Sequence, residues 1–330
     1  MPITLSGLRR YPVKSCRGES LRSAVVEAWG LAGDRRWMLV DESGARVSAR
    51  EAHGLLRVVP RLTGSGLRLT WDADAGASAA GAGSPDGASL APLDVATPTR
   101  DSARVVPVHP NRTDLDALSA GEAADAWFSA AAGRAVRLVY LADPSLNVVN
   151  PVFGRPGDVT AFTDGYPLLL ASASSLAQLN DWMAEEAGAA GPPAVWPLEM
   201  ERFRPNLVVS GAPAFSEDGW VRLRIGSATF RAVKGCERCV MTTLDPVSGR
   251  GGKEPIATLA RHRRWDGKVW FAMNVIPDDP GATIAVGDEV EVLETRDASD
   301  GPPRPPVEHV HAAHPEAVDA AAVDPTAAAL

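Results

Sequence analysis

Short alternating apolar runs, separated by glycine-containing turns, constrain the fold of this sequence more than any other feature. Trp37–Val40 is followed by the turn residues 41–44 and an alternating stretch over 45–49, which is typical of a β-hairpin. Further strands are predicted at 67–71, 105–108, 207–209, 221–225, 228–233, 268–275 and 286–293. Many closely spaced strands and few helices predict an α+β, mainly β fold with a barrel-like core.

Two helices are predicted between the strands. Residues 122–132 form an alanine-rich segment that Gly133 can end. Over 174–187, the apolar residues fall at helical spacing on one face, and we expect them to be core residues: Leu176, Leu179, Trp182 and Met183. By contrast, 221–225 alternates apolar residues with Arg222 and Arg224 and predicts a strand with one polar face, and 268–275 alternates again.

Two segments have the composition of unstructured chain. Small residues without periodicity fill 72–91, which predicts a flexible insertion. Residues 297–330 are rich in Pro, Ala, Asp and His, which predicts a disordered tail. The three histidines of this tail are expected to be solvated rather than bound to metal: His309, His311 and His314.

Charge and hydropathy exclude some functions. Lys and Arg number 33 and Asp and Glu 41, giving a net charge of −8, which disfavours a protein that binds nucleic acid by neutralising phosphates. No apolar run reaches the roughly 18–20 residues needed to span a bilayer. The first fifteen residues lack the apolar core of a signal peptide. We therefore expect a cytoplasmic protein that contacts neither nucleic acid nor membrane.

The three cysteines are Cys16, Cys236 and Cys239, too few for a disulfide scaffold or a four-thiolate cluster. Cys236 and Cys239 form a C-x-x-C motif after a predicted strand, and Lys234 and Arg238 beside them favour thiolates. Three interpretations are open: the two cysteines form half of a zinc site, a thioredoxin-like redox pair, or two inert buried thiols. The following residues, 242–246, are expected to run extended into a turn.

Cations and polar residues occupy several predicted turns: Lys14, Ser15, Arg35, Arg204 and Asn206. Each of them, taken alone, is typical of a solvated surface residue. Together they would suit a phosphorylated ligand with many hydrogen-bonding groups, because Arg and Lys bind phosphate well. Spacing along the sequence does not show whether they converge.

With these motifs the chain resembles MOSC proteins, in particular the branch that contains the mitochondrial amidoxime-reducing component and its bacterial relatives. The stretches YPVKSCRGE and GDRRWMLVD resemble the N-terminal β domain of that family. TDGYPLLLASASSLAQLN, RFRPNLVVSG, GCERCVMTTLDPVSG, GGKEPIATL and GATIAVGDEVEVL resemble the MOSC domain. The resemblance implies an N-terminal β-rich domain over 1–140 and a MOSC β-barrel, similar to that of pyruvate kinase, over 141–296.

The resemblance implies a molybdenum–molybdopterin cofactor with the Cys239 thiolate as metal ligand. Soft sulfur donors suit this metal. It also implies cofactor contacts at nine positions: Lys14, Ser15, Arg35, Asp164, Tyr166, Ser172, Arg204, Asn206 and Arg238. Cys236 matches a family cysteine without a catalytic role. Pyridoxal phosphate is a further cofactor associated with the family.

The activity implied is reduction of small N-hydroxylated compounds, such as amidoximes and hydroxylamines. Because we find no iron–sulfur motif, we expect an external electron donor of ferredoxin or flavoprotein type. A sulfur carrier with a persulfide on Cys239 and a carrier of the molybdenum cofactor are the alternatives. The chain departs from the family pattern at Glu237, which places an acid beside an expected anion site. We also expect it to lack the desulfurase, iron–sulfur and anchoring segments that some family members carry.

Overall fold

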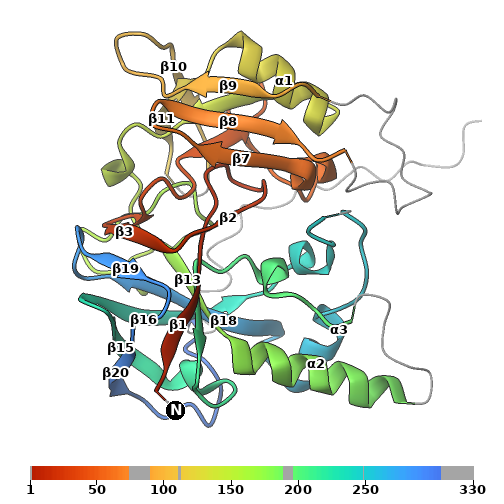
Figure 1. The fold of residues 1–330 in the computed structure, drawn as a ribbon, viewed down its shortest axis with the longest axis vertical. Helices are drawn as coiled ribbons and strands as arrows, with labels where there is room; N and C mark the ends of the chain where they lie inside the picture. The colour runs from red at the N-terminus through yellow and green to blue at the C-terminus, as the bar shows by residue number, and fades with distance from the viewer. Residues whose placement is uncertain (1, 74–89, 111–112, 189–195, 248, 306–330) are drawn as a thin grey trace, which may run out of the picture.

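The computed structural model describes residues 2–73, 90–110, 113–188, 196–247 and 249–305. Within these ranges the chain forms twenty strands and three α-helices, so the mainly β prediction is confirmed. The molecule has two halves, with β7 (Val58–Leu62), β8 (Gly66–Trp71), β9 (Leu93–Ala96) and α1 (Glu122–Ala132) at one end and the largest sheet with α2 (Ala173–Ala187) at the other (Figure 1). None of the helices in the described ranges is both long and apolar enough to cross a membrane.

The largest sheet has nine strands and curls into a barrel. Its path runs through β2 (Glu19–Ser20), β1 (Thr4–Arg10), β14 (Leu207–Ser210), β13 (Leu168–Ser172), β18 (Lys268–Pro277), β16 (Ala228–Glu237), β15 (Trp220–Ile225) and β20 (Val290–Thr295), with β17 (Arg264–Trp265) beside β18. Its pairs are antiparallel except β13 with β14. The sheet closes on itself because Leu5 N donates to Asp288 O at 2.9 Å and Val290 N donates to Ile3 O at 2.8 Å.

The alternation predicted for 268–275 is not seen in the burial of this strand. In β18 both faces are buried: Met273 and Val275 point into the barrel, and Phe271 and Ala272 pack outside it. The reason is that the barrel core covers one face of this strand while α3 (Ile256–His262) packs against the other. Strands covered on both sides lose the polar alternation of a half-exposed strand.

Both predicted helices are present. α1 spans Glu122–Ala132 and ends at Gly133, whose left-handed φ of 69° favours glycine. α2 spans Ala173–Ala187, and its predicted face packs outside the barrel with Leu179 and Met183 buried. The short helix α3 has no counterpart among the predictions.

The other half contains a five-stranded sheet and a three-stranded one. The first runs β10 (Val105–Val108), β11 (Leu115–Ser119), β12 (Arg137–Tyr140), β5 (Trp37–Val40), β6 (Arg46–Val47). The second runs β7 (Val58–Leu62), β8 (Gly66–Trp71), β9 (Leu93–Ala96). β5 and β6 form the predicted hairpin, since Leu39 pairs with Val47. A core that includes Trp37, Leu69 and Phe128 joins these strands to α1.

Strands near the N-terminus also pair with the C-terminal half. β1 pairs with β14, and β3 (Ser23–Glu27) lies between β4 (Gly30–Leu31) and β19 (Thr283–Ala285). The first thirty residues therefore cross both halves, although the sequence assigns them to one domain. These strand pairings connect the N-terminal and C-terminal segments that carry the candidate site residues.

Residues 297–305 of the predicted disordered tail are ordered, so this part of the prediction is wrong. Residues 297–305 lie against the barrel because Gly235 N donates to Pro303 O at 2.9 Å and Arg304 pairs with Asp266 at 2.8 Å. Pro302 is buried in this contact. Residues 306–330, with the three histidines, and 74–89 of the predicted insertion lie outside the described residues.

Candidate functional site

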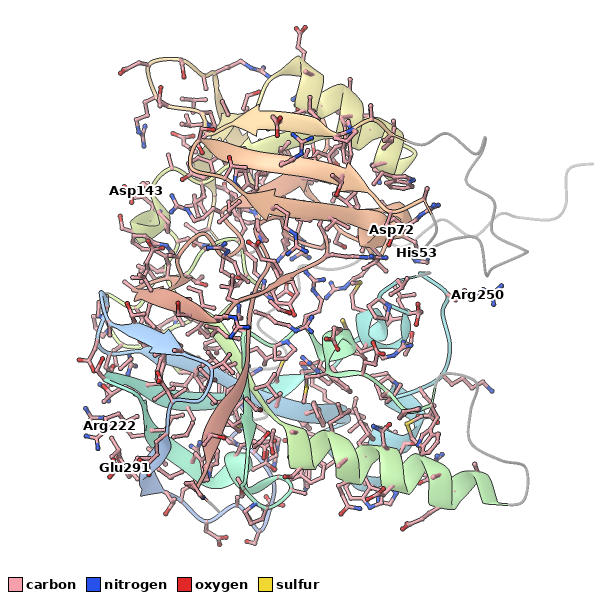
Figure 2. The ribbon with its side chains drawn as sticks, viewed as in Figure 1. His53, Asp72, Asp143, Arg222, Arg250 and Glu291 are labelled. Atoms are coloured by element: carbon pink, nitrogen blue, oxygen red, sulfur yellow. The ribbon has the colours of Figure 1, made fainter. Side chains whose placement is uncertain are left out.

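The candidate site lies where the N-terminal half meets the barrel. The loop that follows Cys239 reaches the N-terminal half, and Arg17 Nη2 donates to Val247 O at 3.4 Å. In Figure 2, His53 and Arg250 mark the two sides of this junction, whereas Arg222 and Glu291 lie at the far end of the barrel. Residues distant in the sequence can thus converge here.

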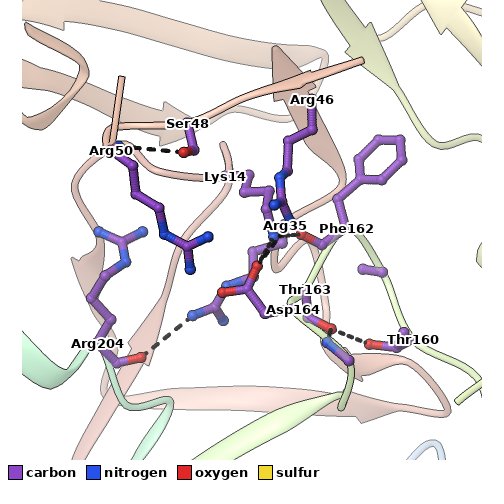
Figure 3. A network of polar contacts seen from close by, with 12 residues as sticks. Lys14, Arg35, Arg46, Ser48, Arg50, Thr160, Phe162, Thr163, Asp164 and Arg204 are labelled. Atoms are coloured by element: carbon purple, nitrogen blue, oxygen red, sulfur yellow. Dashed lines mark hydrogen bonds and ion pairs between the residues drawn. The ribbon is translucent and has the colours of Figure 1, made fainter. Parts of the chain in front are cut away.

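Lys14 is a buried cation of the site. Its Nζ donates to Phe162 O at 2.9 Å and to Asp164 Oδ1 at 2.6 Å (Figure 3). Burial lowers the pKa of Lys14 to about 8, whereas the Lys14 ammonium lowers the pKa of Asp164. The Asp164 side chain is 72% exposed, so water weakens this ion pair. Arg46 approaches the same carboxylate at 3.5 Å.

Arg35 is held by three groups from two segments. Its Nη1 donates to Asp34 Oδ2 at 2.5 Å and to Asn206 Oδ1 at 3.0 Å, and its Nη2 donates to Arg204 O at 3.4 Å. Asn206 is buried and also donates from Nδ2 to Arg9 O at 3.1 Å. Asn206 therefore fixes Arg35 and links it to Arg9 at the end of β1.

The Tyr11 ring brings the Arg35 and Arg204 guanidinium groups close together. The guanidinium carbons lie 4.5 Å (Arg35) and 4.3 Å (Arg204) from the ring centroid. Such contacts stabilise a cation through the π-system of the ring. Arg35 and Arg204 both have left-handed φ, 46° and 55°. Non-glycine residues adopt this conformation where the surroundings enforce it, often at functional sites.

Two buried nitrogen atoms of the site lack partners. Arg204 Nη2 and Arg238 Nε are enclosed and make no hydrogen bond to any described residue. The pKa of Arg204 is lowered mainly by burial. No carboxylate of the described residues forms an ion pair with Arg204, whereas Arg35 pairs with Asp34. Buried cations are costly unless an anion or acceptor satisfies them. This arrangement fits an anionic ligand with several hydrogen-bond acceptors.

Cys239 is exposed at the edge of this cluster, between β16 and the 3-10 helix η7 (Val240–Thr243). Arg50 Nη2 from the N-terminal half lies 3.3 Å from Cys239 Sγ. Its side chain points toward the same space as Lys14 and Arg46 in Figure 3. The site therefore joins an accessible sulfur to a group of cations.

Sequence reasoning missed Arg46 and Arg50. Both lie in or just after the second strand of the hairpin, four residues apart. Nothing in their local pattern distinguishes them from ordinary surface charges. Only the long-range packing of β6 against the barrel side of the junction brings them to Asp164 and Cys239.

The other residues of the cysteine motif have separate contacts. Cys236 is partly buried and accepts a hydrogen bond from Arg238 Nη1 at 2.8 Å. Glu237 pairs with Lys268 at 2.7 Å. Lys268 thus compensates the charge of the Glu237 carboxylate. This contact reduces the repulsion of an anionic ligand that the position of Glu237 in the sequence suggests.

The residues after Cys239 are not all extended, so that prediction is wrong. Val240–Thr243 forms η7. The hydroxyl groups of Thr242 and Thr243 donate to Cys239 O at 3.0 Å and Val240 O at 2.8 Å. Threonine hydroxyls satisfy carbonyls three residues earlier and thereby favour a helical turn over a strand.

Two arginines tie the cysteine loop to the 3-10 helix η5 (Met200–Phe203). Arg202 from η5 donates to Leu244 O at 2.9 Å and to Asp245 Oδ2 at 3.0 Å. In return, Arg238 Nη2 donates to Phe203 O at 2.7 Å. These reciprocal contacts set the position of Cys239 relative to Arg204.

Three of the residues implied by the resemblance lie apart from these contacts. Ser15 is buried in the turn after Lys14, with a φ of 70°, and its hydroxyl makes no hydrogen bond to a described residue. Ser172 has a buried, unpartnered Oγ, and alternation along β13 places it with Leu168 on the barrel side. Tyr166 packs edge-to-face on Phe153 with a centroid distance of 6.5 Å.

The histidine considered for a zinc site has other contacts. His262 stacks on Trp182 with a centroid distance of 4.1 Å, and its Nε2 lies 2.8 Å from Glu186 Oε1. The residues that the structure describes contain no group of three or more His, Cys, Asp or Glu able to hold a metal ion.

Comparison with known proteins gives two family matches. Residues 3–135 match the MOSC N-terminal beta barrel domain, and residues 157–291 match the MOSC domain. Human mitochondrial amidoxime-reducing component 1 is 32% identical over 309 residues, covering 88% of this chain and 83% of the relative. The protein of that name from Xenopus laevis is 30% identical over 273 residues, covering 79% and 72%.

A relative with a different name matches the same region. Molybdenum cofactor sulfurase of Oryza sativa subsp. japonica is 33% identical over 279 residues, which cover 82% of this chain. The matched part is 32% of the sulfurase, so this chain corresponds to about a third of that protein.

Proposed function

Since this chain belongs to the MOSC family, we propose that it binds a molybdenum–molybdopterin cofactor and reduces N-hydroxylated compounds such as amidoximes. Relatives named for amidoxime reduction match more than two thirds of their own length and support a role of oxidoreductase type. The substrate class, the metal ligand and the cofactor contacts are the parts of this proposal that go beyond family membership.

One observation carries the proposal: an exposed thiol lies beside a group of cations whose buried nitrogen atoms lack partners. Arg50 joins the two parts through its contact with Cys239. A phosphorylated pterin with sulfur-bound molybdenum needs both parts, because phosphate pairs with guanidinium and a soft metal accepts a thiolate. The residues present therefore fit the group.

In this proposal Cys239 supplies the protein ligand to the metal. Arg204 and Arg238 offer their unpartnered nitrogen atoms to acceptors on the cofactor, and Lys14 and Arg35 add positive charge nearby. The cofactor, when bound, supplies the redox chemistry that removes oxygen from the substrate. The chain's own contribution is to bind and orient it, with Arg202 and Asn206 holding the binding side chains in place.

A sulfur carrier is the second candidate. The accessibility of Cys239 and its contact with Arg50 would also suit a persulfide, which is anionic. The match to about a third of a molybdenum cofactor sulfurase supports this alternative. The thiol would need an external desulfurase as sulfur donor. Incubation with a cysteine desulfurase and cysteine should then add one sulfur atom to Cys239, as measured by mass spectrometry.

The proposed reductase is tested by metal content and turnover. The wild type and the variants Cys239→Ser and Cys236→Ser are purified from a host that makes the cofactor. We expect molybdenum and benzamidoxime reduction, with a chemical reductant, in the wild type and in Cys236→Ser. Cys239→Ser should lose both. Negligible molybdenum in all three proteins would reject the proposal, and bound cofactor without turnover would favour a cofactor carrier.

Three further predictions accompany the proposal. Electrons come from a ferredoxin or flavoprotein, the protein resides in the cytoplasm, and no nucleic acid is bound. The expected association with pyridoxal phosphate also stays a prediction.

A further inference from the structure

A pocket of about 420 Å³ opens beside Cys239, away from the N-terminal cations. Its walls include Arg238, Cys239, Val240, Lys253, Ile256 and Ala257, which all come from the C-terminal half. Arg50 reaches Cys239 from the N-terminal half. Cys239 thus contacts the Arg50 guanidinium and also lines this pocket.

The chemistry of the pocket wall is specific. Val240, Ile256 and Ala257 are apolar, and Val240 is 57% exposed, so its side chain is open to contact with a ligand. The described residues that line the pocket include two cations, Arg238 and Lys253, and no carboxylate. The lining therefore combines apolar surface with positive charge in a protein whose net charge is −8.

Lys253 is the cation that remains available to a ligand. Its ammonium makes no hydrogen bond or ion pair with any residue in the described ranges, whereas Arg238 is bound to Phe203 O and Cys236 Sγ. The neighbouring Glu254 carboxylate accepts a hydrogen bond from Thr258 N of α3 at 3.0 Å. The acid next in sequence is thus bound to the first turn of α3 rather than to Lys253.

We propose that this pocket binds the substrate and selects N-hydroxylated aromatic compounds that carry a carboxylate, with Lys253 as the specificity-determining residue. This inference rests on the proposed reductase function. The aromatic ring would pack on Val240, Ile256 and Ala257, the carboxylate would pair with Lys253, and the N-hydroxyl group would face Cys239. A pocket of this size suits a small aromatic molecule, and the local charge selects an anion that the rest of the surface repels.

The test compares two substrates of nearly equal shape, 4-carboxybenzamidoxime and its uncharged 4-carbamoyl analogue. The readout is the ratio of their kcat/KM values in the molybdenum-loaded enzyme. We expect the wild type to prefer the carboxylate and Lys253→Met to lower the ratio by about fivefold, the upper range for an exposed ion pair. Lys253→Glu should lower it further. Arg261→Met removes a cation of α3 that pairs with Glu186, and should leave the ratio unchanged.

A binding measurement separates this inference from the proposed function. Isothermal titration of both compounds into the same proteins gives the ratio of dissociation constants without turnover. If neither compound is reduced but the binding ratio follows the charge at position 253, the reductase proposal fails and the pocket assignment stands. If both compounds are reduced and neither ratio responds to Lys253→Met or Lys253→Glu, the pocket assignment is wrong and the reductase stands.

Discussion

Arg50 Nη2 lies 3.3 Å from Cys239 Sγ and joins residues that are 189 positions apart in the chain. Ser48 Oγ accepts from Arg50 N at 3.3 Å and helps to fix the start of this side chain. The contact places positive charge from one half of the molecule on the only exposed thiol among the described cysteines. Its electrostatic effect on chemistry at the sulfur is directly measurable.

We expect Arg50→Gln to lower the preference of Cys239 for anionic reagents. The rate of alkylation by iodoacetate, divided by the rate with neutral iodoacetamide, reports the local potential, because the thiolate fraction cancels in the ratio. Loss of one nearby cation should lower this ratio several-fold at low ionic strength, and less at high salt. The measurement uses a Cys236→Ser background. Arg261→Gln is the control, and an equal effect of both variants would contradict the prediction.

Arg204→Gln should separate stability from ligand binding. Without an anion, the partly buried Arg204 guanidinium is uncompensated, so its removal should stabilise the ligand-free protein by about 1–2 kcal/mol, although a contact with Tyr11 is lost. The same variant should retain at least tenfold less molybdenum cofactor, since buried charged partners contribute strongly to binding. Urea unfolding and metal analysis measure the two effects. A ligand-free protein that is strongly destabilised would show that Arg204 is structural.

Arg202→Gln tests whether the contacts between η5 and the cysteine loop position the site. Arg202 is buried, and its replacement removes the hydrogen bonds that it donates to Leu244 O and Asp245 Oδ2. We expect destabilisation of about 2–4 kcal/mol together with loss of cofactor, because Cys239 is no longer fixed relative to Arg204.

A matched control separates position from stability. Arg263→Gln breaks another buried pair, with Asp218, away from the cysteine loop. It should be destabilised by a similar amount yet keep its cofactor in the folded fraction. Equal cofactor loss in both variants would mean that Arg202 acts through stability alone. Arg202→Lys, which keeps the charge, should recover part of the cofactor content.

The sequence predicts the regular elements better than the site. α1 and α2 are found because they have helical periodicity and, at Gly133, a helix stop. α3 is missed because its seven residues are too few to show a period. β18 is found as a strand, but its burial on both faces is not, because this burial depends on neighbours distant in the sequence.

The candidate site, too, is predicted only in part from the sequence. The C-x-x-C motif and the cations in turns are visible locally, and the resemblance supplies their roles. Their convergence is not visible, since Lys14 meets Asp164 across 150 residues. Arg46 and Arg50 carry no local signal, and the partners of Glu237 and Arg238 depend on which strands pair. Local sequence patterns do not predict long-range pairing of this kind.

The last prediction concerns the buried carboxyl group of Glu217, which neither the site nor the proposed function uses. Its side chain accepts from Ser175 Oγ at 2.7 Å and has no exposed surface, and burial raises the pKa of Glu217 to about 7 from a usual 4.5. Between these values the unfolded chain releases a proton that the folded protein keeps. The stabilisation due to this proton is therefore fully present below pH 4.5, falls as the pH rises, and is lost above pH 7. The loss should be about 3 kcal/mol at most.

Urea unfolding of the wild type and Glu217→Gln from pH 4 to pH 8 measures this contribution, because the amide keeps the shape of the carboxyl group but does not titrate. The free energy of unfolding of the wild type, minus that of the variant, should fall as the pH rises. Glu186 provides the opposite case, since hydrogen bonding to Arg261 lowers the pKa of Glu186 to about 2. For Glu186→Gln the same difference should be largest above pH 4.5 and shrink as the pH falls toward 2. A difference for Glu217→Gln that is constant with pH would mean that this carboxyl group titrates normally in the folded protein.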